Sequence, residues 1–232
     1  MEPVTSPVCI GIDIGQQRDP TAIVVVETSE RDSGRMRHVD AHTDGAGHHQ
    51  AYDTPIREAV FEVRSIAALP LGTSYPEVAQ RVASVVCHQQ IFYRERIVRV
   101  DVTGVGRPVF EMIEEAIRAQ PFGSRVTLRP ITFTHGDRFD WARGVLGKAY
   151  LVSRLQALLQ SKRLKLPPQH AEAEALAREL KDYEIHVDRD ANDTYGAFKV
   201  GAHDDLATAL GLAVIEEPDA HSITVGPRLY PA

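Results

Sequence analysis

The sequence lacks the features that mark membrane, secreted and zinc-binding proteins. No apolar stretch approaches the roughly 18–20 residues that a bilayer-spanning helix needs, and residues 1–7 carry no basic region of the kind that begins a signal peptide. The chain has only two cysteines, Cys9 and Cys87. We therefore expect buried free thiols in a reducing, cytoplasmic compartment, with no disulfide framework, no zinc site and no membrane partner.

The sequence also lacks the phosphate-binding loop of an ATPase. Residues 144–149 contain two glycines and a lysine, but they have neither the spacing nor the hydroxyl of the G-x-x-x-x-G-K-[ST] motif. We therefore expect no ATPase domain. The length of 232 residues suits a single domain over residues 1–232, with a polar loop insertion or extended hairpin tip at about 28–58 and a C-terminal tail at about 216–232.

Three aspartates lie in or beside short apolar runs, where charged side chains are rare. Asp13 lies within residues 9–15, a run that predicts a buried strand. Asp101 ends a second such run, residues 97–101, and Asp205 begins a helix rich in alanine and leucine. An unpaired carboxylate in a low-dielectric interior is costly, and divalent cations offset that cost. Three converging carboxylates would form the oxygen-rich site that Mg²⁺ or Mn²⁺ prefers.

The order of the expected elements indicates an α/β fold. Apolar runs predict strands over residues 9–15, 21–27, 60–69, 97–101 and 125–133, and a hairpin over 183–187 and 195–200. Helical spacing predicts helices that begin near Ser74 and Pro108 and others over 145–159, 171–180 and 204–215. Three early strands followed by alternating helices and strands predict a mixed sheet, with antiparallel and then parallel strands, and helices on both faces.

Several short motifs follow one another in an order that is more specific than any one of them. In chain order they are Gly11-Ile12-Asp13-Ile14-Gly15, Asp19 with Thr21-Ala22-Ile23, residues 71–77, residues 100–106, Lys148 before a leucine-rich helix, and His203-Asp204-Asp205-Leu206. In this order the chain resembles the nuclease domain of the terminase large subunit of tailed phages, a member of the RNase H-like, RuvC-like nuclease superfamily. The resemblance implies an RNase H-like fold.

The resemblance also implies a two-metal nuclease site. Phosphodiester hydrolysis needs an activated water and stabilisation of charge on the leaving oxygen, and two divalent ions about 3.5–4 Å apart can supply both. Asp13, in a central strand, is the candidate that bridges the ions. Asp101 would bind one ion, and an acid of the last helix would complete the other. We therefore expect a Mg²⁺- or Mn²⁺-dependent endonuclease that cuts duplex DNA with little sequence specificity.

By the same resemblance, the chain would act in viral DNA packaging within the host cytoplasm. Its partners would then be double-stranded DNA and the terminase ATPase domain, small subunit and portal. Because no ATPase motif accompanies the nuclease motifs, the chain is either an excised domain or a free-standing relative.

The last helix offers two neighbouring aspartates as metal ligands. Its apolar stripe consists of Leu206, Ala209, Leu210, Ala213 and Val214. At 100° per residue Asp205 lies nearer that stripe than Asp204, so Asp205 is the expected catalytic ligand. Asp204 is the expected N-cap and the second candidate ligand. The alternative is that both are helix-start acids that suit the helix dipole.

Positive charge is concentrated in one segment, although the net charge is −6. Residues 125–165 hold nine basic and two acidic residues, so this segment carries +7 and the remainder −13. Local patches of this kind bind phosphate irrespective of the total charge. Arg143, Lys148 and Arg154 are the expected DNA contacts, and Lys148 is a candidate for holding the scissile phosphate. The alternative is a solvated helix face.

Other side chains have two interpretations each. Asp19, before Pro20, either initiates a turn or has an outer-sphere role. His203 either shuttles protons or is structural. The histidines within residues 38–49 either bind a metal or belong to a solvated loop.

Three other functions are alternatives to a terminase-like nuclease. A RuvC-like junction resolvase shares the fold and the acidic site. A sugar-kinase or actin-like ATPase has similar loops after its strands but needs two such domains, for which 232 residues are too few. A non-catalytic DNA-binding or assembly module gives no reason to keep three buried acids.

Overall fold

The computed structural model describes residues 6–15, 19–40, 51–104, 106–121, 123–134, 136–187 and 204–216. Within these residues eight strands form one sheet in the order β6-β7-β5-β4-β1-β2-β3-β8. The strands are β1 (Val8–Asp13), β2 (Ala22–Asp40), β3 (Ala51–Ala68), β4 (Arg96–Asp101), β5 (Val126–Thr134), β6 (Phe139–Asp140), β7 (Val145–Gly147) and β8 (Leu164–Lys165). The helices are α1 (Tyr75–Val86), α2 (Gly106–Arg118), α3 (Lys148–Gln160), α4 (Ala173–Val187) and α5 (Asp205–Ala213), with the short 3₁₀ helix η1 (Gly123–Arg125).

The pairing of the central strands confirms the expected fold class. β1, β2 and β3 are antiparallel, whereas β4 runs parallel to β1 and β5 runs parallel to β4. Ile12 lies opposite Val100 in the parallel pair, so β1 and β4 end side by side. This mixed sheet has the RNase H-like strand arrangement.

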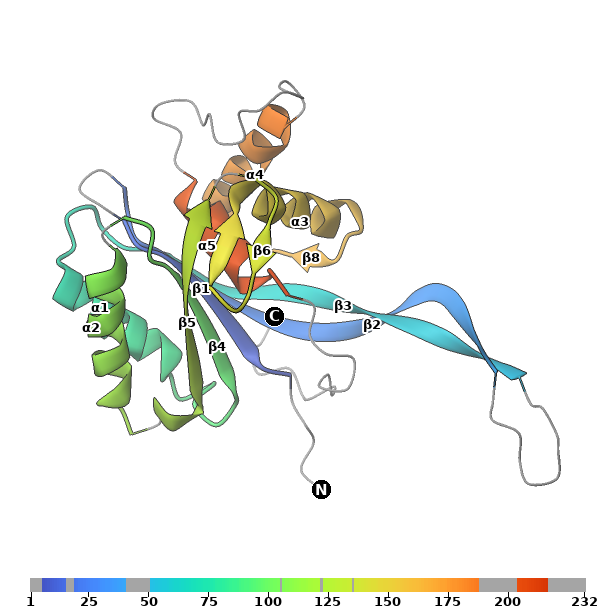
Figure 1. Cartoon of the computed structure of the whole chain (residues 1–232), viewed down its shortest axis with the longest axis horizontal. Helices are drawn as coiled ribbons and strands as arrows, with labels where there is room; N and C mark the ends of the chain where they lie inside the picture. Colours follow the sequence, from blue (N-terminus) through green and yellow to red (C-terminus); the bar gives the residue numbers. More distant parts are fainter. Residues whose placement is uncertain are drawn as a thin grey trace.

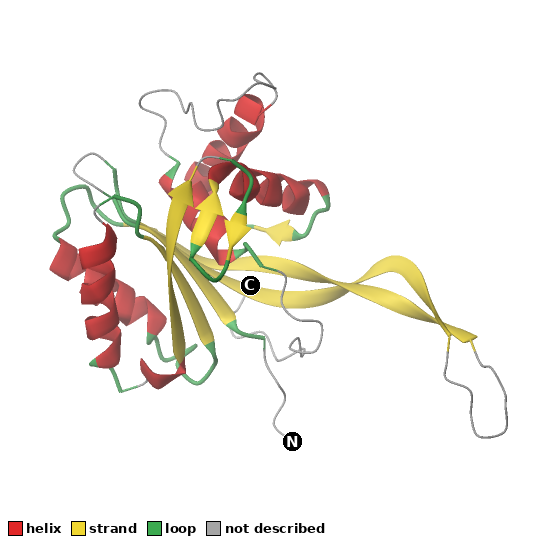
Figure 2. Cartoon of the chain, viewed as in Figure 1, coloured by secondary structure: helices red, strands yellow, loops and turns green. Residues whose placement is uncertain are grey.

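Helices cover the two faces of the sheet (Figures 1 and 2). α1 and α2 pack on one face, where Ile10, Ile12 and Val98 contribute to the core. α3, α4 and α5 pack on the other face with a second apolar cluster. Successive side chains of a strand point to opposite faces. Because Ile10 and Ile12 face α1 and α2, Gly11 and Asp13 face α5.

The helices begin close to where local sequence signals place them. Ser74 and Glu77 form the expected capping box at the start of α1, with the Ser74 amide donating to Glu77 Oε2 over 3.1 Å. α2 begins at Gly106, near Pro108. The helix expected from residue 145 begins at Lys148, because residues 145–147 pair with β5 as β7.

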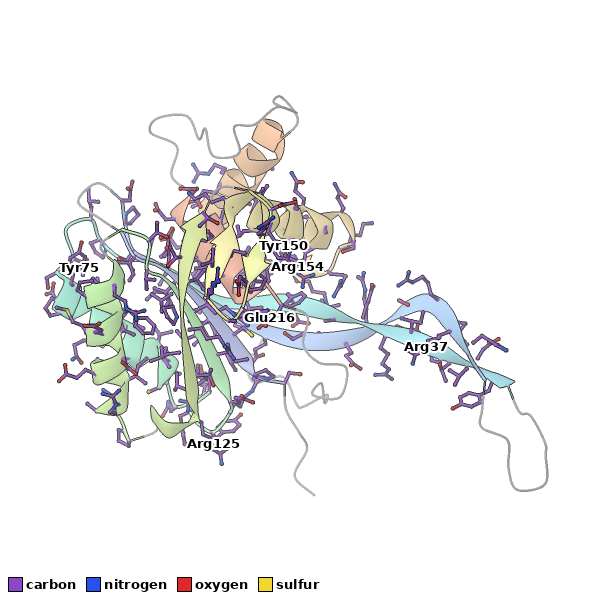
Figure 3. All side chains as sticks on the ribbon, in the orientation of Figure 1. Arg37, Tyr75, Arg125, Tyr150, Arg154 and Glu216 are labelled. Carbon is purple, nitrogen blue, oxygen red and sulfur yellow. The ribbon has the colours of Figure 1, made fainter. Side chains whose placement is uncertain are left out.

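The β2–β3 hairpin extends well beyond the body of the molecule (Figure 1). Residues 28–40 and 51–58, where a polar loop insertion or an extended hairpin tip was expected, are strand, and residues 41–50 lie outside the described part. Figure 3 shows Arg37 far out on this arm. Near the body, the Arg31 guanidinium donates to the carbonyls of Ser161 and Lys162 at 2.6 and 2.9 Å, tying the arm to the end of α3.

The structure corrects one expected hairpin. Residues 183–187 were expected as a strand but form the last turns of α4. Their proposed partner strand, residues 195–200, lies outside the described residues, as does the C-terminal tail from residue 217. β-branched and aromatic residues favour strands only weakly and yield to a helix already in progress. Among the helices of the described ranges, none is both long and apolar enough to cross a membrane.

Candidate active site

Four aspartates from three elements line one open pocket of about 270 Å³. Asp13 ends β1, Asp101 ends the adjacent parallel strand β4, and Asp204 and Asp205 begin α5. The lining also includes Asp19, Thr103 and Lys148. The structure therefore brings together the acids that the sequence singled out, and Lys148 with them.

A close contact between β1 and α5 sets the depth of the pocket. A Cβ atom on Gly11 would lie 1.8 Å from the carbonyl oxygen of Ala209, so only glycine lets α5 approach the strand this closely. The start of α5 consequently lies near the end of β1, where Asp13 projects. Just beyond β1, the Gly15 amide donates to Thr21 Oγ1 over 3.0 Å.

Asp101 is fixed by the turn that follows β4. The Thr103 amide donates to Asp101 Oδ1 over 2.8 Å, a turn in which an aspartate accepts from the backbone two residues on. Thr103 Oγ1 in turn accepts from the Phe133 amide of β5 over 2.9 Å. The sequence indicated the turn, but the hydrogen bond that ties it to β5 joins residues 30 positions apart.

The two aspartates of α5 lie in different environments. Asp205 is 7% exposed, the burial expected from its place near the apolar stripe. Asp204 occupies the N-cap position, but its side chain makes no capping hydrogen bond among the described residues. Its Oδ2 atom lies 3.8 Å from Lys148 Nζ instead. Asp204 therefore occupies the expected N-cap position, but the expectation that its side chain accepts the backbone amides of α5 is wrong.

A glutamate from another helix caps α5. Glu179 Oε2, on α4, accepts a hydrogen bond of 2.8 Å from the amide of Ala207. Burial, together with repulsion from Asp205 and Asp204, raises the pKa of Glu179 to about 7. Sequence analysis missed this residue, because nothing in the local pattern of residues 171–180 distinguishes Glu179 from the other acids of that helix.

Arginines hold the opposite end of α5. Arg99 donates to the carbonyl of Leu212 over 3.3 Å and forms an ion pair with Glu216. The Nε atom of Arg154 donates to the carbonyl of Val214 over 2.9 Å. Figure 3 labels Arg154 and Glu216 in this region. Cations at a helix C-terminus and acids at its N-terminus both suit the helix dipole. These contacts stabilise the helix that carries Asp205.

The three expected DNA contacts therefore differ in their surroundings. Arg143 is 82% exposed in its side chain, 3.8 Å from Asp140. Lys148 lies at the start of α3 with 43% of its side chain exposed. Arg154 is half-buried and bonded to α5. Only the first two present much of their charge to solvent.

The carboxylates of the pocket repel one another. Burial and then repulsion from Asp101, Asp205 and Asp204 raise the pKa of Asp13 well above its ordinary value, and Lys148 offsets only part of this. Burial also raises the pKa of Asp101, against the hydrogen bonds from Thr103. Among the described residues, these close acids have one neighbouring lysine, which leaves an unbalanced negative charge that a cation would neutralise.

The donor set suits a hard divalent cation. All four aspartates offer oxygen ligands, the pocket is open to solvent, and neither cysteine nor histidine is among the described residues that line it. In the ranges that the structure covers, no three acidic, histidine or cysteine side chains are already drawn together into a metal-binding cluster. The acids share one pocket.

The remaining candidates lie at the margin of the site or outside the described residues. Asp19 lines this pocket and also a second one, formed with residues 70–75. His38, of the expected histidine cluster, lies on the arm with its Nδ1 atom 2.8 Å from Asp53. The other histidines of that cluster lie outside the described part of the chain, and so does His203.

Comparison with known proteins found similar chains among solved structures. No family model matches the sequence, and no curated protein matches it. Among solved structures, the large terminase nuclease from thermophilic phage G20c is 17% identical, with a TM-score of 0.47, and covers 91% of this chain and 85% of its own. The human cytomegalovirus terminase nuclease domain, soaked with Mn, is 14% identical, with a TM-score of 0.49 and coverages of 91% and 83%.

A RuvC structure is also similar. The Thermus thermophilus RuvC structure is 15% identical, with a TM-score of 0.35, and covers 90% of this chain and 91% of its own. The chain has the mixed-sheet strand order and pairing of an RNase H-like fold.

Proposed function

We propose that the chain is a metal-dependent DNA endonuclease. One observation carries the proposal: buried and half-buried, mutually repelling aspartates from two parallel strand ends and one helix start line a single open pocket. Structural ion pairs would place a cation beside each acid, whereas the described lining of this pocket has five aspartates and one lysine, which lies beside Asp204. An arrangement that is unfavourable without a cation is typical of sites that bind divalent metals.

Asp13, Asp101 and Asp205 would hold the ions, and Asp204 is the alternative ligand from α5. Bound Mg²⁺ or Mn²⁺ would supply an activated water and neutralise charge on the leaving oxygen. Asp13 lies centrally in the group, since its pKa responds to Asp101, Asp205 and Asp204. Its central strand fits the bridging position. Thr103 orients Asp101, and the Gly11–Ala209 approach positions Asp205.

Lys148 is suited to hold the phosphate that is cut. It begins α3 at the rim of the pocket, and its Nζ atom lies 3.8 Å from Asp204 Oδ2. A lysine here offers a compact point charge to a phosphate oxygen without fixing its orientation. Arg143 lies in the same basic segment and would contact the DNA backbone. Phosphate contacts carry no base information, so cleavage should depend little on sequence.

The order of the motifs extends the proposal to viral DNA packaging. In that setting the chain would cut double-stranded DNA together with a terminase ATPase domain, a small subunit and a portal, in the host cytoplasm. The RuvC-like alternative would select four-way junctions instead. Both activities use the same acids, so the substrate distinguishes them.

The test is cleavage by the purified chain of a supercoiled plasmid, a linear duplex and a four-way junction, with Mn²⁺, Mg²⁺ or EDTA. We expect nicking or cutting of the duplexes with either metal, and none in EDTA. Asp13→Asn should abolish cleavage while the circular dichroism spectrum is unchanged. Cleavage of the junction alone would favour the resolvase. Activity in Asp13→Asn equal to wild type would exclude the proposed site.

A further inference from the structure

Glu179 reaches the active-site helix from a separate element. It lies on α4 one turn after Leu176 and beside Leu180, both of which are buried in the core that α4 shares with α5. Side chains three and four residues apart share a helix face, so Glu179 is on the side of α4 that packs inward. Its carboxylate accepts the Ala207 amide over 2.8 Å, a contact between residues 28 positions apart.

This contact replaces the cap that α5 would otherwise take from its own sequence. The first amides of a helix have no partner within the helix. Asp204 stands at the N-cap but makes no capping bond within the described chain. Glu179 accepts instead, from Ala207 and from the neighbouring Leu206 amide. Asp204 is therefore left to face the pocket, and Glu179, from another helix, accepts the backbone amides of α5 instead.

The same contact fixes where α5 begins. Asp205 is the first residue of the helix, two positions before Ala207. At its other end α5 is held by Arg99 and Arg154, which bind the carbonyls of Leu212 and Val214. At its start the described side-chain contact to the backbone comes from Glu179. A shift of the first turn would carry Asp205 away from Asp13.

The placement of an acid here is otherwise unfavourable. Glu179 lies near Asp204 and Asp205, and their repulsion together with burial raises its pKa to about 7. An acid kept close to two others against that repulsion needs a compensating interaction. The two helix amides and the positive end of the α5 dipole provide one.

We propose that Glu179 is a positioning residue for the acidic site: by accepting the first amides of α5, it holds Asp205 in register with Asp13. The inference rests on the proposed nuclease function and names an additional residue on which that function depends. Glu179 acts through the backbone of α5 and binds neither metal nor DNA.

Three variants of Glu179 separate the effect of the length of its side chain from the effect of its negative charge. Glu179→Gln removes the charge but keeps an oxygen at the same distance from Ala207. Glu179→Asp keeps the charge but is one methylene shorter and cannot reach Ala207. Glu179→Ala removes both. Glu174→Ala is the matched control, since Glu174 is an exposed acid on the same helix.

The measurements are the Kd for Mn²⁺ by calorimetry, kcat and KM for duplex cleavage, and the melting temperature in EDTA. We expect Glu179→Asp and Glu179→Ala to weaken Mn²⁺ binding and lower kcat by about tenfold, the factor of one lost helix cap. KM for DNA should stay within about twofold, because the DNA-facing cations are untouched. Glu179→Gln should recover Mn²⁺ affinity and kcat to within about threefold of wild type, and Glu174→Ala should match wild type.

Each contrary outcome has a distinct meaning. If Glu179→Gln is as impaired as Glu179→Ala while Glu179→Asp is active, the carboxylate acts through its charge and the positioning role is wrong. If all three variants bind Mn²⁺ like wild type, Glu179 has no role in the site. If wild type itself neither binds Mn²⁺ nor cuts DNA, the nuclease proposal fails first, and the melting temperatures alone report the cap.

Discussion

Asp13 lies half-buried at the end of β1, and its pKa is raised first by burial and then by repulsion from Asp101 and the aspartates of α5. An acid with a higher pKa in the folded chain holds its proton more tightly there, so folding is favoured at low pH. That advantage is lost as the pH rises through the folded pKa. Glu179, whose pKa is raised from 4.5 to about 7, has the same sign. The metal-free protein should therefore lose stability as the pH rises from about 4 towards 7.

Asp13→Asn should reduce this loss, because it removes the central charge without changing the volume of the side chain. We expect the melting temperature in EDTA at pH 7.5 to rise by about 2–4 °C, the effect of about 1 kcal/mol in a domain of this size. At pH 4 the gain should vanish, since Asp13, whose pKa is raised well above its ordinary value, is then largely protonated. Asp140→Asn, a change at the protein surface, is the control. A gain of equal size at both pH values would contradict repulsion as the cause.

Asp204 and Asp205 should separate in their effects on activity. Asp205 is 7% exposed and lines the pocket, whereas Asp204 is paired with Lys148 and makes no capping bond among the described residues. Asp205→Asn should reduce kcat at least a hundredfold, as expected for loss of a metal ligand. Asp204→Asn should lower kcat less than tenfold and change the free energy of unfolding by less than about 0.5 kcal/mol. Cleavage kinetics and urea unfolding measure both, and inactivity of Asp204→Asn alone would reverse the assignment.

At the scale of elements, the strands and helix that carry the acids could be predicted, and the contacts that align them could not. β1 and β4 are short apolar runs that end in aspartate, and α5 is an alanine-rich helix with an acidic start, so each has a strong local signal. The arm was less evident, because a two-stranded ribbon exposed along much of its length has no apolar alternation to detect. Residues 183–187 have β-branched residues but continue a helix.

The contacts that sequence could not supply join distant parts of the chain. The glutamate that caps α5 is 28 residues away from its partner, and Arg154 is 60 residues from Val214. A local pattern cannot identify such partners, since an inward-facing Glu or Arg on an amphipathic helix resembles its solvent-exposed neighbours. This is also why Arg154 was expected at the DNA surface.

Arg154 therefore provides a prediction about an element and its stability. Its Nε atom donates to the Val214 carbonyl at the end of α5, and its guanidinium lies 5.3 Å from the centre of the Phe61 ring. Arg154→Ala should destabilise the fold by about 1–2 kcal/mol through loss of a charge-assisted hydrogen bond and a favourable dipole interaction. Arg143→Ala, at an exposed site, should leave stability within about 0.5 kcal/mol of wild type. Urea unfolding followed by circular dichroism measures both, and equal midpoints would show that the Arg154 bond contributes nothing.

At the scale of the whole molecule, charge is divided between the two parts of the chain. Residues 125–165 carry +7 within a chain of net charge −6. This segment includes β5, β6, β7 and α3, whereas α1 and α2 cover the opposite face of the sheet. DNA that approaches the pocket would meet the positive segment and Lys148 first. The acidic remainder would repel DNA from other orientations.

This division predicts how DNA affinity depends on salt and on position. Binding to duplex DNA in Ca²⁺ or EDTA should weaken steeply with salt, because each phosphate contact releases condensed counterions. Arg143→Glu should weaken binding to all duplex sequences alike and reduce the slope of log Kd against log salt by about 1, as for one lost phosphate contact. Arg118→Glu is the matched control: Arg118 is 70% exposed on α2, on the other face of the sheet, and the charge change is the same. Fluorescence anisotropy at several salt concentrations measures both variants.

We expect Arg118→Glu to bind nearly as tightly as wild type, since only net charge changes and the Debye length is about 8 Å at physiological salt. Equal losses in the two variants would assign DNA binding to overall charge, and the basic segment would then be a solvated surface.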